Sequence, residues 1–148
     1  MDRENIHSYF MRIAYTVASR STCIKRKVGS VIVKDKKIIS TGYNNPSVGL
    51  PNCTKETCIL DKAGKCVLGS HSEQNCILQA SPEERKGATL YCTTQPCSKC
   101  QLIILNSGIT HVIYDEEHPP EYDFFKNTHV KCQSLKEILK NDSIRKDE

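Results

Sequence analysis

The sequence indicates an α/β domain in which one sheet carries helices on its faces. Three observations lead to this fold class. An amphipathic segment opens the chain, and β-rich runs then alternate with helical segments. No apolar run approaches the roughly 18–20 residues that a membrane-spanning helix needs. The length of 148 residues is usual for one domain, so 1–148 are expected to form a single unit.

The first half of the chain predicts a helix, a hairpin and a long loop. Apolar residues at i, i+4, i+7, i+8 and i+11 form one helix face; they are Ile6, Phe10, Ile13, Ala14 and Val17. Two β-rich runs, 28–33 and 37–43, are separated by three residues and predict a hairpin. The following segment, 44–70, contains three cysteines. A structureless stretch of this length is unusual in a compact domain, so we expect a Cys-bearing insertion that is either disordered or held in place by something.

The second half alternates helices and strands. Residues 71–80 and 96–106 are predicted helices, because Pro82 stops the first and Gly108 follows the second. Strands are predicted at 88–94 and 111–115, followed by a loop that contains Pro119 and Pro120. A last strand at 130–133 and a last helix at 134–140 complete the order. The charged tail, 141–148, is expected to fray.

The amino-acid composition indicates which kinds of molecule the protein is expected to bind. The 21 basic and 17 acidic residues leave a net charge of +4, which suits anionic small molecules. Six Tyr, three Phe and no Trp provide few groups that could stack on RNA bases, so nucleic acid is not an expected partner. The first ten residues lack the apolar core of a secretory signal, so a cytoplasmic, reducing setting is expected. In that setting nine cysteines indicate metal binding or catalysis.

Two short motifs carry the chemistry, and each opens a predicted helix. They are H-S-E at 71–73 and P-C-S-K-C at 96–100. Cys97 and Cys100 are three residues apart and share a helix face, and a helix N-terminus favours the thiolate. One strand separates the two helices, so both N-termini can point at one spot and bring His71 to the two thiolates. Zn²⁺ prefers these ligands, and three protein ligands leave its fourth position for water.

Glu73 is then expected beside that water and not on the metal. Zinc can lower the pKa of its water to about 7 and give a hydroxide nucleophile. Glu73 would accept the proton of the water and deliver it to the substrate. The combination H-x-E…P-C-x-x-C is the known signature of zinc nucleobase deaminases. A capping histidine or buried thiols would explain each residue alone, but not their joint arrangement.

From about Arg20 to Asp115 the chain resembles the deoxycytidylate (dCMP) deaminases, within the wider cytidine deaminase-like fold. The stretches that carry the resemblance are RSTCIKRKVGSVIV, IISTGYN, the Cys-bearing segment GLPNC…C…C, HSEQNCIL and ATLYCTTQPCSKCQLIILNSGITHVIY. The resemblance implies a three-layer α/β/α cytidine deaminase-like fold with a central mixed sheet. It also implies zinc-dependent hydrolysis of dCMP to dUMP and ammonia, a reaction that feeds thymidylate synthesis.

The resemblance also implies roles for single residues. His71, Cys97 and Cys100 match the zinc ligands, and Glu73 matches the proton shuttle. The implied substrate contacts are Asn44, Ser72, Thr94, Gln95 and, for the 5′-phosphate, Arg26 or Lys25. A homo-oligomer, with a hexamer favoured, is implied as well. So are dCTP and dTTP as effectors, the former together with Mg²⁺.

The chain departs from the family at several positions. Ser72 and Cys76 stand where the family usually has Ala, and both are small enough to keep the backbone geometry. Leu68 stands where relatives often carry Arg. The loop 42–49 lacks one family Gly and has its Pro shifted by one residue. Because this loop helps relatives to bind dCTP or dTTP, control by these effectors is left open.

The remaining cysteines fall into two groups. Cys23 precedes the first strand, and Cys53, Cys58 and Cys66 lie in the long segment, where a metal would offset the entropy of ordering it. We hypothesise a second, structural zinc on these four, with buried thiols or a disulfide as the alternative. Three further cysteines are expected in the core: Cys76, Cys92 and Cys132. Four histidines without partner spacing are expected at surface or structural positions: His7, His111, His118 and His129.

Two other functions remain open. The first is a deaminase for another substrate, such as a modified dCMP, a nucleoside or a tRNA adenosine. The Cys-bearing insertion argues against the tRNA enzymes, which lack it. The second is a non-catalytic, zinc-stabilised nucleotide-binding protein, against which the intact Glu73 and the three-ligand count argue.

Overall fold

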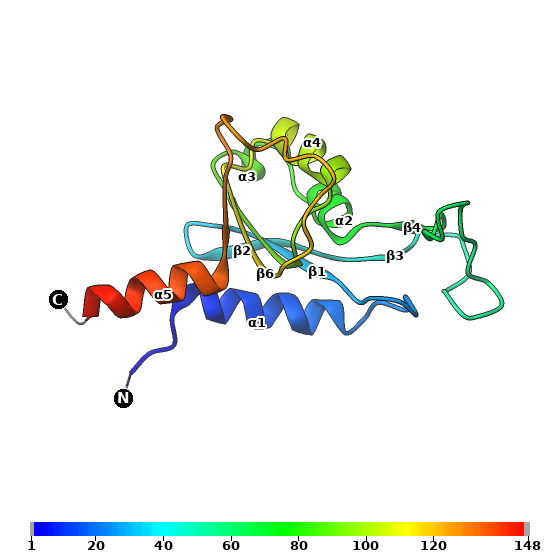
Figure 1. The fold of residues 1–148 in the computed structure, drawn as a ribbon, viewed down its shortest axis with the longest axis horizontal. Helices are drawn as coiled ribbons and strands as arrows, with labels where there is room; N and C mark the ends of the chain where they lie inside the picture. Colours follow the sequence, from blue (N-terminus) through cyan, green and yellow to red (C-terminus); the bar gives the residue numbers. More distant parts are fainter. Residues whose placement is uncertain (1, 147–148) are drawn as a thin grey trace.

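A five-stranded sheet separates two layers of helices in the computed structural model, which describes the backbone of residues 2–146 and the side chains of 2–143 (Figure 1). The strands are β1 (Gly29–Lys34), β2 (Lys37–Tyr43), β5 (Thr89–Thr94), β6 (His111–Glu116) and β7 (Lys131–Ser134). They lie in the order β2-β1-β5-β6-β7. Strand β1 is antiparallel to β2 and β5, whereas β5, β6 and β7 are parallel. The sheet is therefore mixed, as the resemblance implied.

Helices α1 (Ile6–Ala18) and α5 (Leu135–Lys146) cover one face of the sheet (Figure 1). Alternate strand residues point to this face, among them Val31, Tyr91 and Ile113, and pack against Phe10 of α1. The side chain of Asn5 caps α1 by accepting a hydrogen bond from the amide of His7. Helix α5 continues through 141–146, which we expected to fray, and 147–148 lie outside the described residues.

Helices α2 (Ser72–Leu78), α3 (Pro82–Arg85) and α4 (Ser98–Ser107) form the layer on the other face. The intervening strand residues Ile32, Leu90 and Val112 pack here against Ile104 of α4. Helix α3 was not expected, because Pro82 was interpreted only as a stop signal. In the structure Pro82 also begins a new helix, which Ser81 caps through a capping box.

Two glycines allow one helix on each face to lie directly on the sheet. A Cβ atom at Gly42 of β2 would lie 2.4 Å from the backbone nitrogen of Cys76 and 2.5 Å from the carbonyl oxygen of Ser72 in α2. A Cβ atom at Gly29 of β1 would lie 2.0 Å from the carbonyl oxygen of Ala14 in α1. The absence of a side chain at these positions therefore sets how closely α1 and α2 approach the strands.

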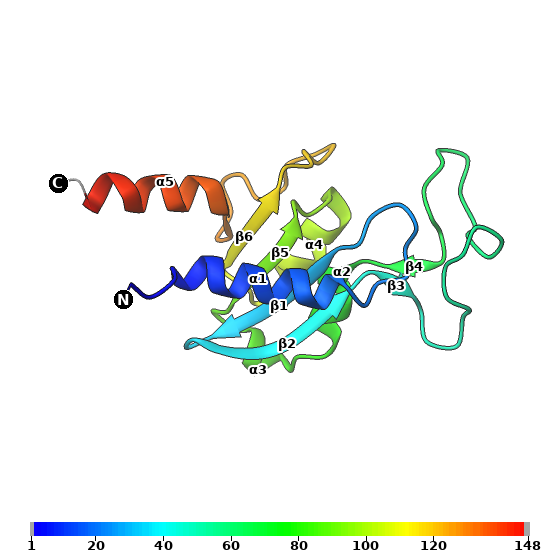
Figure 2. The ribbon, with the colours of Figure 1, turned by 90° about the horizontal axis from the view of Figure 1, so that it is seen from below.

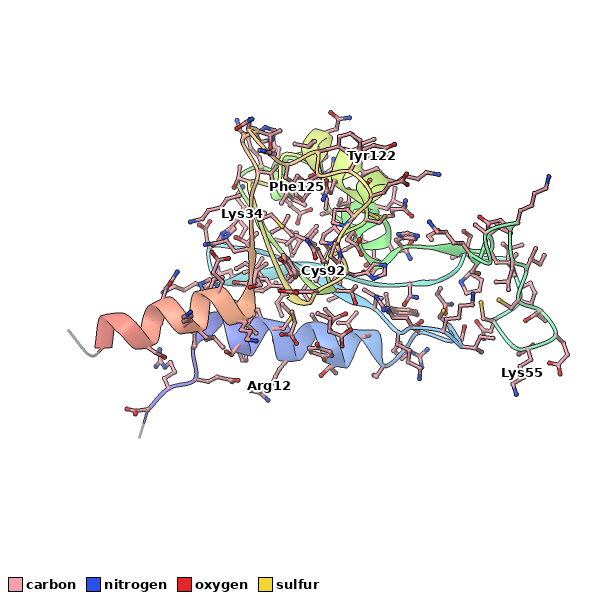
Figure 3. All side chains as sticks on the ribbon, viewed as in Figure 1. Arg12, Lys34, Lys55, Cys92, Tyr122 and Phe125 are labelled. Atoms are coloured by element: carbon pink, nitrogen blue, oxygen red, sulfur yellow. The ribbon has the colours of Figure 1, made fainter. Side chains whose placement is uncertain are left out.

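Residues 44–70, here called the insertion, extend away from the sheet (Figure 2). Two short strands, β3 (Asn45–Pro46) and β4 (Gly69–Ser70), pair at its base. Lys55 lies far out on this segment (Figure 3). The insertion returns toward the segment before β1, because Thr22 donates to the Asn45 side chain at 2.8 Å and the ammonium of Lys25 donates to the carbonyl of Gly64.

Over the residues that the structure describes, no helix combines the length and apolarity needed to cross a bilayer. All nine cysteines carry free thiols. The disulfide that was one alternative for the cysteines of the insertion is therefore not formed in this structure.

Candidate active site

The site lies where two helices begin. His71 is the N-cap of α2 and directly follows β4, and Cys97 is the N-cap of α4, three residues after the end of β5. Both residues have extended backbones, with ψ angles of 157° and 166°, so the chain turns sharply into each helix. The Gln74 side chain accepts a hydrogen bond from the amide of His71 at 2.9 Å and fixes this turn. The two helix starts therefore converge as the motif spacing predicted.

The three predicted zinc ligands meet at this point. His71 Nδ1 lies 3.5 Å from Cys97 Sγ and 3.2 Å from Cys100 Sγ, and the three ligand atoms are all within 4.8 Å of one another. A tetrahedral zinc with ordinary bond lengths separates a ligand nitrogen from a ligand sulfur by about 3.6 Å. Cys100 is fully buried, whereas His71 is exposed, so the site is open on one side. The three residues therefore fit a zinc ion that keeps one open position.

The charges of the cluster favour a bound cation. The pKa of Cys97 is lowered to about 3, mainly because the Cys100 thiol donates a hydrogen bond to it and secondly because His71 does so. The pKa of Cys100 is raised in turn by that hydrogen bond, by burial and by the nearby carboxylate of Glu73. The pKa of His71 is raised first by its hydrogen bond with Cys97. These interactions favour the thiolate form of Cys97, which is the form in which a cysteine binds a divalent metal.

Glu73 lies in the first turn of α2, with only 4% of its surface exposed. Its Oε1 atom accepts hydrogen bonds from the Ser72 hydroxyl at 2.5 Å and from the Cys92 thiol at 3.4 Å. Glu73 lines the same small cavity as His71 and Cys97, and its carboxylate contributes to the raised pKa of Cys100. Glu73, which the H-x-E motif predicts as the acid–base residue, therefore lies next to the His71 cluster.

A small cavity of about 200 Å³ lies against this cluster and adjoins an outer cavity of about 890 Å³. Five predicted substrate contacts line the inner cavity: Arg26, Asn44, Ser72, Thr94 and Gln95. Lys25 lines only the outer cavity. Arg26, Asn44, Ser72, Thr94 and Gln95 thus share one cavity with the ligand cluster, whereas Lys25 lies further out, and their roles as substrate contacts stay predictions.

The polar side chains that line the inner cavity differ in whether they already have a hydrogen-bond partner in the protein. The Asn44 amide donates to the carbonyl of Arg26 and accepts from the amide of Val28, both at 2.8 Å, so it holds the segment before β1. The Ser72 hydroxyl is fully buried and directed at Glu73. By contrast, the Thr94 hydroxyl is buried and lacks a hydrogen-bond partner among the described residues. Such a group needs a partner from the molecule that fills the cavity.

His118 is a residue of this site that the sequence did not reveal. It lines both cavities, and its backbone amide donates to Gln95 Oε1 at 3.1 Å. The backbone amide of Gln95 donates in turn to the backbone carbonyl of Glu116 at 2.9 Å. These two hydrogen bonds attach the loop after β6 to the end of β5. Our expectation of a surface or structural role placed His118 away from the site. No motif or periodicity marks it, because only the folding back of this loop brings it there.

The four cysteines proposed for a second metal come near one another, but less closely than the first cluster. Among the described residues only the His71 cluster has its ligand atoms within 4.8 Å of one another. Burial raises the pKa of Cys53, and the neighbouring Cys66, Cys23 and Cys58 raise it further. The pKa of Cys66 is lowered despite its burial, because two backbone amides and the thiols of Cys58 and Cys53 donate to its sulfur. Cys66 therefore has the surroundings of a thiolate.

Comparison with known proteins gives consistent results. A family model described as cytidine and deoxycytidylate deaminase zinc-binding region matches residues 4–116. A deoxycytidylate deaminase of Mycobacterium phage D29 is 38% identical over 130 residues, which cover 79% of this chain and 99% of the phage protein. The deoxycytidylate deaminase of Saccharomyces cerevisiae is also 38% identical over 130 residues, covering 84% of this chain; the match spans only 42% of the yeast protein.

A solved structure shows the same fold. The crystal structure of dCMP deaminase from the cyanophage S-TIM5 in complex with dCMP and dUMP superposes with a TM-score of 0.74 at 26% sequence identity. The superposition covers 91% of this chain and 100% of the phage chain. The three-layer architecture implied by the resemblance is thereby confirmed.

Proposed function

This chain belongs to the cytidine and deoxycytidylate deaminase family, and from that premise we propose that it converts dCMP to dUMP and ammonia by zinc-dependent hydrolysis. The observation that carries the proposal is the convergence of His71, Cys97 and Cys100 beside a buried Glu73 at the end of a nucleotide-sized cavity. The phage relative solved with dCMP and dUMP supports this choice of substrate.

Different residues of the chain would bind the metal and transfer protons in this reaction. His71, Cys97 and Cys100 would hold the zinc, which when bound supplies a water with a pKa lowered to about 7. Glu73 accepts a proton at its carboxylate and donates it to ring nitrogen 3 of cytosine, and then carries a second proton to the leaving amine. The inner cavity of about 200 Å³ accommodates a pyrimidine and leaves little room for bulk water around it.

The 5′-phosphate has cationic partners on the way out of the inner cavity. Arg26 lines the inner cavity and Lys25 the outer one, and Asn44 holds the carbonyl of Arg26 in place. We expect Arg26→Ala to raise KM for dCMP on the order of tenfold, with little change for deoxycytidine, which has no phosphate. An equal effect on both substrates would contradict the assignment.

A panel of substrates tests the function. Ammonia release is measured with dCMP, CMP, deoxycytidine, 5-methyl-dCMP and a tRNA anticodon stem-loop. Turnover of dCMP well above the others supports the proposal, whereas preference for another member identifies a different deaminase. A zinc-loaded protein that releases no ammonia from any of them would be a nucleotide-binding protein instead.

The Glu73→Ala variant tests the mechanism. It should retain the fold and one zinc in the His71 cluster but lose activity by at least about a thousandfold, because Glu73 is the carboxylate that lines the inner cavity with His71 and Cys97 and would move the protons. Glu83→Ala in the exposed helix α3 is the matched control and should keep wild-type activity. Near-normal turnover in Glu73→Ala would overturn the assigned role.

We further propose that Cys23, Cys53, Cys58 and Cys66 hold a structural zinc. Cys23, Cys53 and Cys66 line one cavity, and the lowered pKa of Cys66 favours the thiolate that zinc binds. Metal analysis should give two zinc ions per chain in the wild type and one in Cys58→Ser. One zinc per chain in both proteins would refute the second site.

We also propose that the protein assembles as a homo-oligomer, with a hexamer favoured. Exposed apolar side chains on α4 and in the loop after β6 support this, because Leu102 is 46% and Tyr122 is 59% exposed. Light scattering with and without dCTP, dTTP and Mg²⁺ tests both the assembly and the effectors. A monomer at micromolar concentration would contradict the proposal.

A further inference from the structure

A buried group of polar side chains lies behind the carboxylate of Glu73. It comprises Ser30 of β1, Ser72 at the start of α2 and Cys92 of β5. Ser30 and Cys92 are direct partners across the antiparallel pair β1–β5, so both side chains project from the same face of the sheet toward α2. All three side chains are 0% exposed, and Cys92 lies at the centre of the molecule (Figure 3).

The hydrogen bonds of this group converge on one atom. Ser72 Oγ donates to Glu73 Oε1 at 2.5 Å, and Cys92 Sγ donates to the same oxygen at 3.4 Å. Ser30 Oγ lies 2.7 Å from Ser72 Oγ and 3.3 Å from Cys92 Sγ. Each of the three donors has a single hydrogen. Because Ser72 and Cys92 use theirs on Glu73, the hydrogen of Ser30 is left for the oxygen and sulfur behind them.

The second carboxylate oxygen is treated differently. Among the described residues, the donors behind the carboxylate all end on Oε1, and the only other side-chain donor that interacts with Glu73 is the Cys100 thiol, on the side of the ligand cluster. One oxygen is therefore held by the interior, while the other is available to move protons between water and substrate. Rotation about the side-chain bonds of Glu73 would break two buried hydrogen bonds. The loss of each costs free energy, because bulk water does not reach a buried group to replace the donor.

We propose that Ser72 and Cys92, supported by Ser30, are positioning residues that hold Glu73 by its Oε1 atom and thereby fix the orientation in which it transfers protons. This inference rests on the proposed function of Glu73. It goes beyond that function because it assigns these three side chains to the carboxylate of Glu73 and not to the substrate. Ser72 acts through its side chain here, in addition to any contact that its backbone makes with the base.

The chemistry of the donors is consistent with this role. Complete burial raises the pKa of Cys92 well above its ordinary value, so the group remains a thiol with a hydrogen to donate. A carboxylate buried without donors would be costly, and the two hydrogen bonds compensate for its loss of water. Because Ser72 is small and fully buried, its replacement by Ala removes the donor without adding bulk to the start of α2.

Steady-state kinetics of the zinc-loaded variants tests the proposal. Ser72→Ala should lower kcat for dCMP on the order of tenfold while KM and the zinc content stay unchanged, because the bond lost is one to a charged group. Ser40→Ala is the matched control, since Ser40 is also a buried serine that hydrogen-bonds α2, through the carbonyl of Cys76, but does not reach Glu73. It should leave kcat unchanged.

A second pair of variants keeps the test independent of Ser72. Cys92→Ser retains a donor and should keep most of the activity, whereas Cys92→Ala removes the donor and should lower kcat severalfold. Crystal structures of the zinc-loaded variants give a readout besides activity. In Ser72→Ala the Glu73 carboxylate should occupy more than one rotamer, whereas in Ser40→Ala it should keep the single one.

The kinetic and crystallographic results distinguish failure of the positioning role from failure of the proposed deaminase function. If the wild type deaminates no member of the substrate panel, the proposed function fails. If the wild type is active and Ser72→Ala matches Ser40→Ala in kcat, with Glu73 still in one rotamer, the positioning role is refuted. A rise in KM at unchanged kcat would also refute it, because it would show that Ser72 binds substrate instead.

Discussion

The contact between Gly42 and α2 allows a sharp test of how the fold holds the site. In Gly42→Ala the new methyl carbon would lie 2.4 Å from the backbone nitrogen of Cys76, which is 1.0 Å short of the 3.4 Å at which ordinary contact begins. The atoms that it meets are backbone, so neither can rotate away. Helix α2 must therefore move off the sheet by about 1 Å at this point, and Ser72 and Glu73 must move with it.

This displacement predicts two separate losses. Overpacking of this kind costs about 1–3 kcal/mol of unfolding free energy, to be measured by denaturant titration. A misplacement of about 1 Å at a proton-transferring group lowers kcat by about a hundredfold, to be measured by ammonia release on dCMP. Both measurements are made under conditions where more than nine-tenths of the variant is folded, so that lost activity reports geometry and not unfolding.

Gly29→Ala is the matched control, because the same substitution on the opposite face of the sheet displaces α1 and leaves α2 alone. Its methyl carbon would lie 2.0 Å from the carbonyl oxygen of Ala14, so the loss of stability should be at least as large. Its kcat, measured on the folded fraction, should nevertheless fall much less than that of Gly42→Ala. If the two variants lose kcat equally, or if Gly42→Ala keeps wild-type activity, the link between this contact and catalysis is wrong.

Three other substitutions test separate parts of the structure. Asn44→Ala removes two hydrogen bonds at 2.8 Å and should cost about 1–3 kcal/mol in a denaturant titration and raise KM for dCMP. Gly108→Ala places a side chain at φ 94° in the αL C-cap of α4 and should cost about 1 kcal/mol in the same assay. Burial, only partly offset by the hydrogen bond with Gln133, lowers the pKa of His111, so the unfolded chain binds a proton more readily. Stability should therefore fall as pH drops below about 6.5, and less steeply in His111→Gln.

Much of the fold could be predicted because its signals are local. The apolar spacing from Ile6 to Val17 and the β-rich runs of the hairpin each depend on short stretches of sequence, and the structure places helix and strands there. The convergence of His71, Cys97 and Cys100 was equally predictable, because Cys97 and Cys100 share one helix turn and His71 begins the helix before. The spacing of residues along one helix or strand does not depend on contacts with distant parts of the chain.

The parts that escaped prediction depend on contacts between distant segments. His118 reaches the cavity only because the loop after β6 is fastened to Gln95, and Ser72 turns toward Glu73 because Ser30 and Cys92 meet behind it. A sequence pattern carries no trace of either contact. The ribbon β3–β4 was missed for a related reason, since two strands of two residues are too short for any periodicity to mark them.

The position of Asn44 joins the insertion to the nucleotide cavity. Its side chain holds Arg26 and Val28, its carbonyl accepts a hydrogen bond from Ser21 at 2.6 Å, and the strand that starts the insertion begins at the next residue. Binding of a ligand that fixes the conformation of the insertion should therefore also fix the segment that carries Arg26, which lines the cavity. Because such coupling is reciprocal, nucleotide bound in the cavity should protect the insertion from proteases, and a cut within the insertion should weaken nucleotide binding.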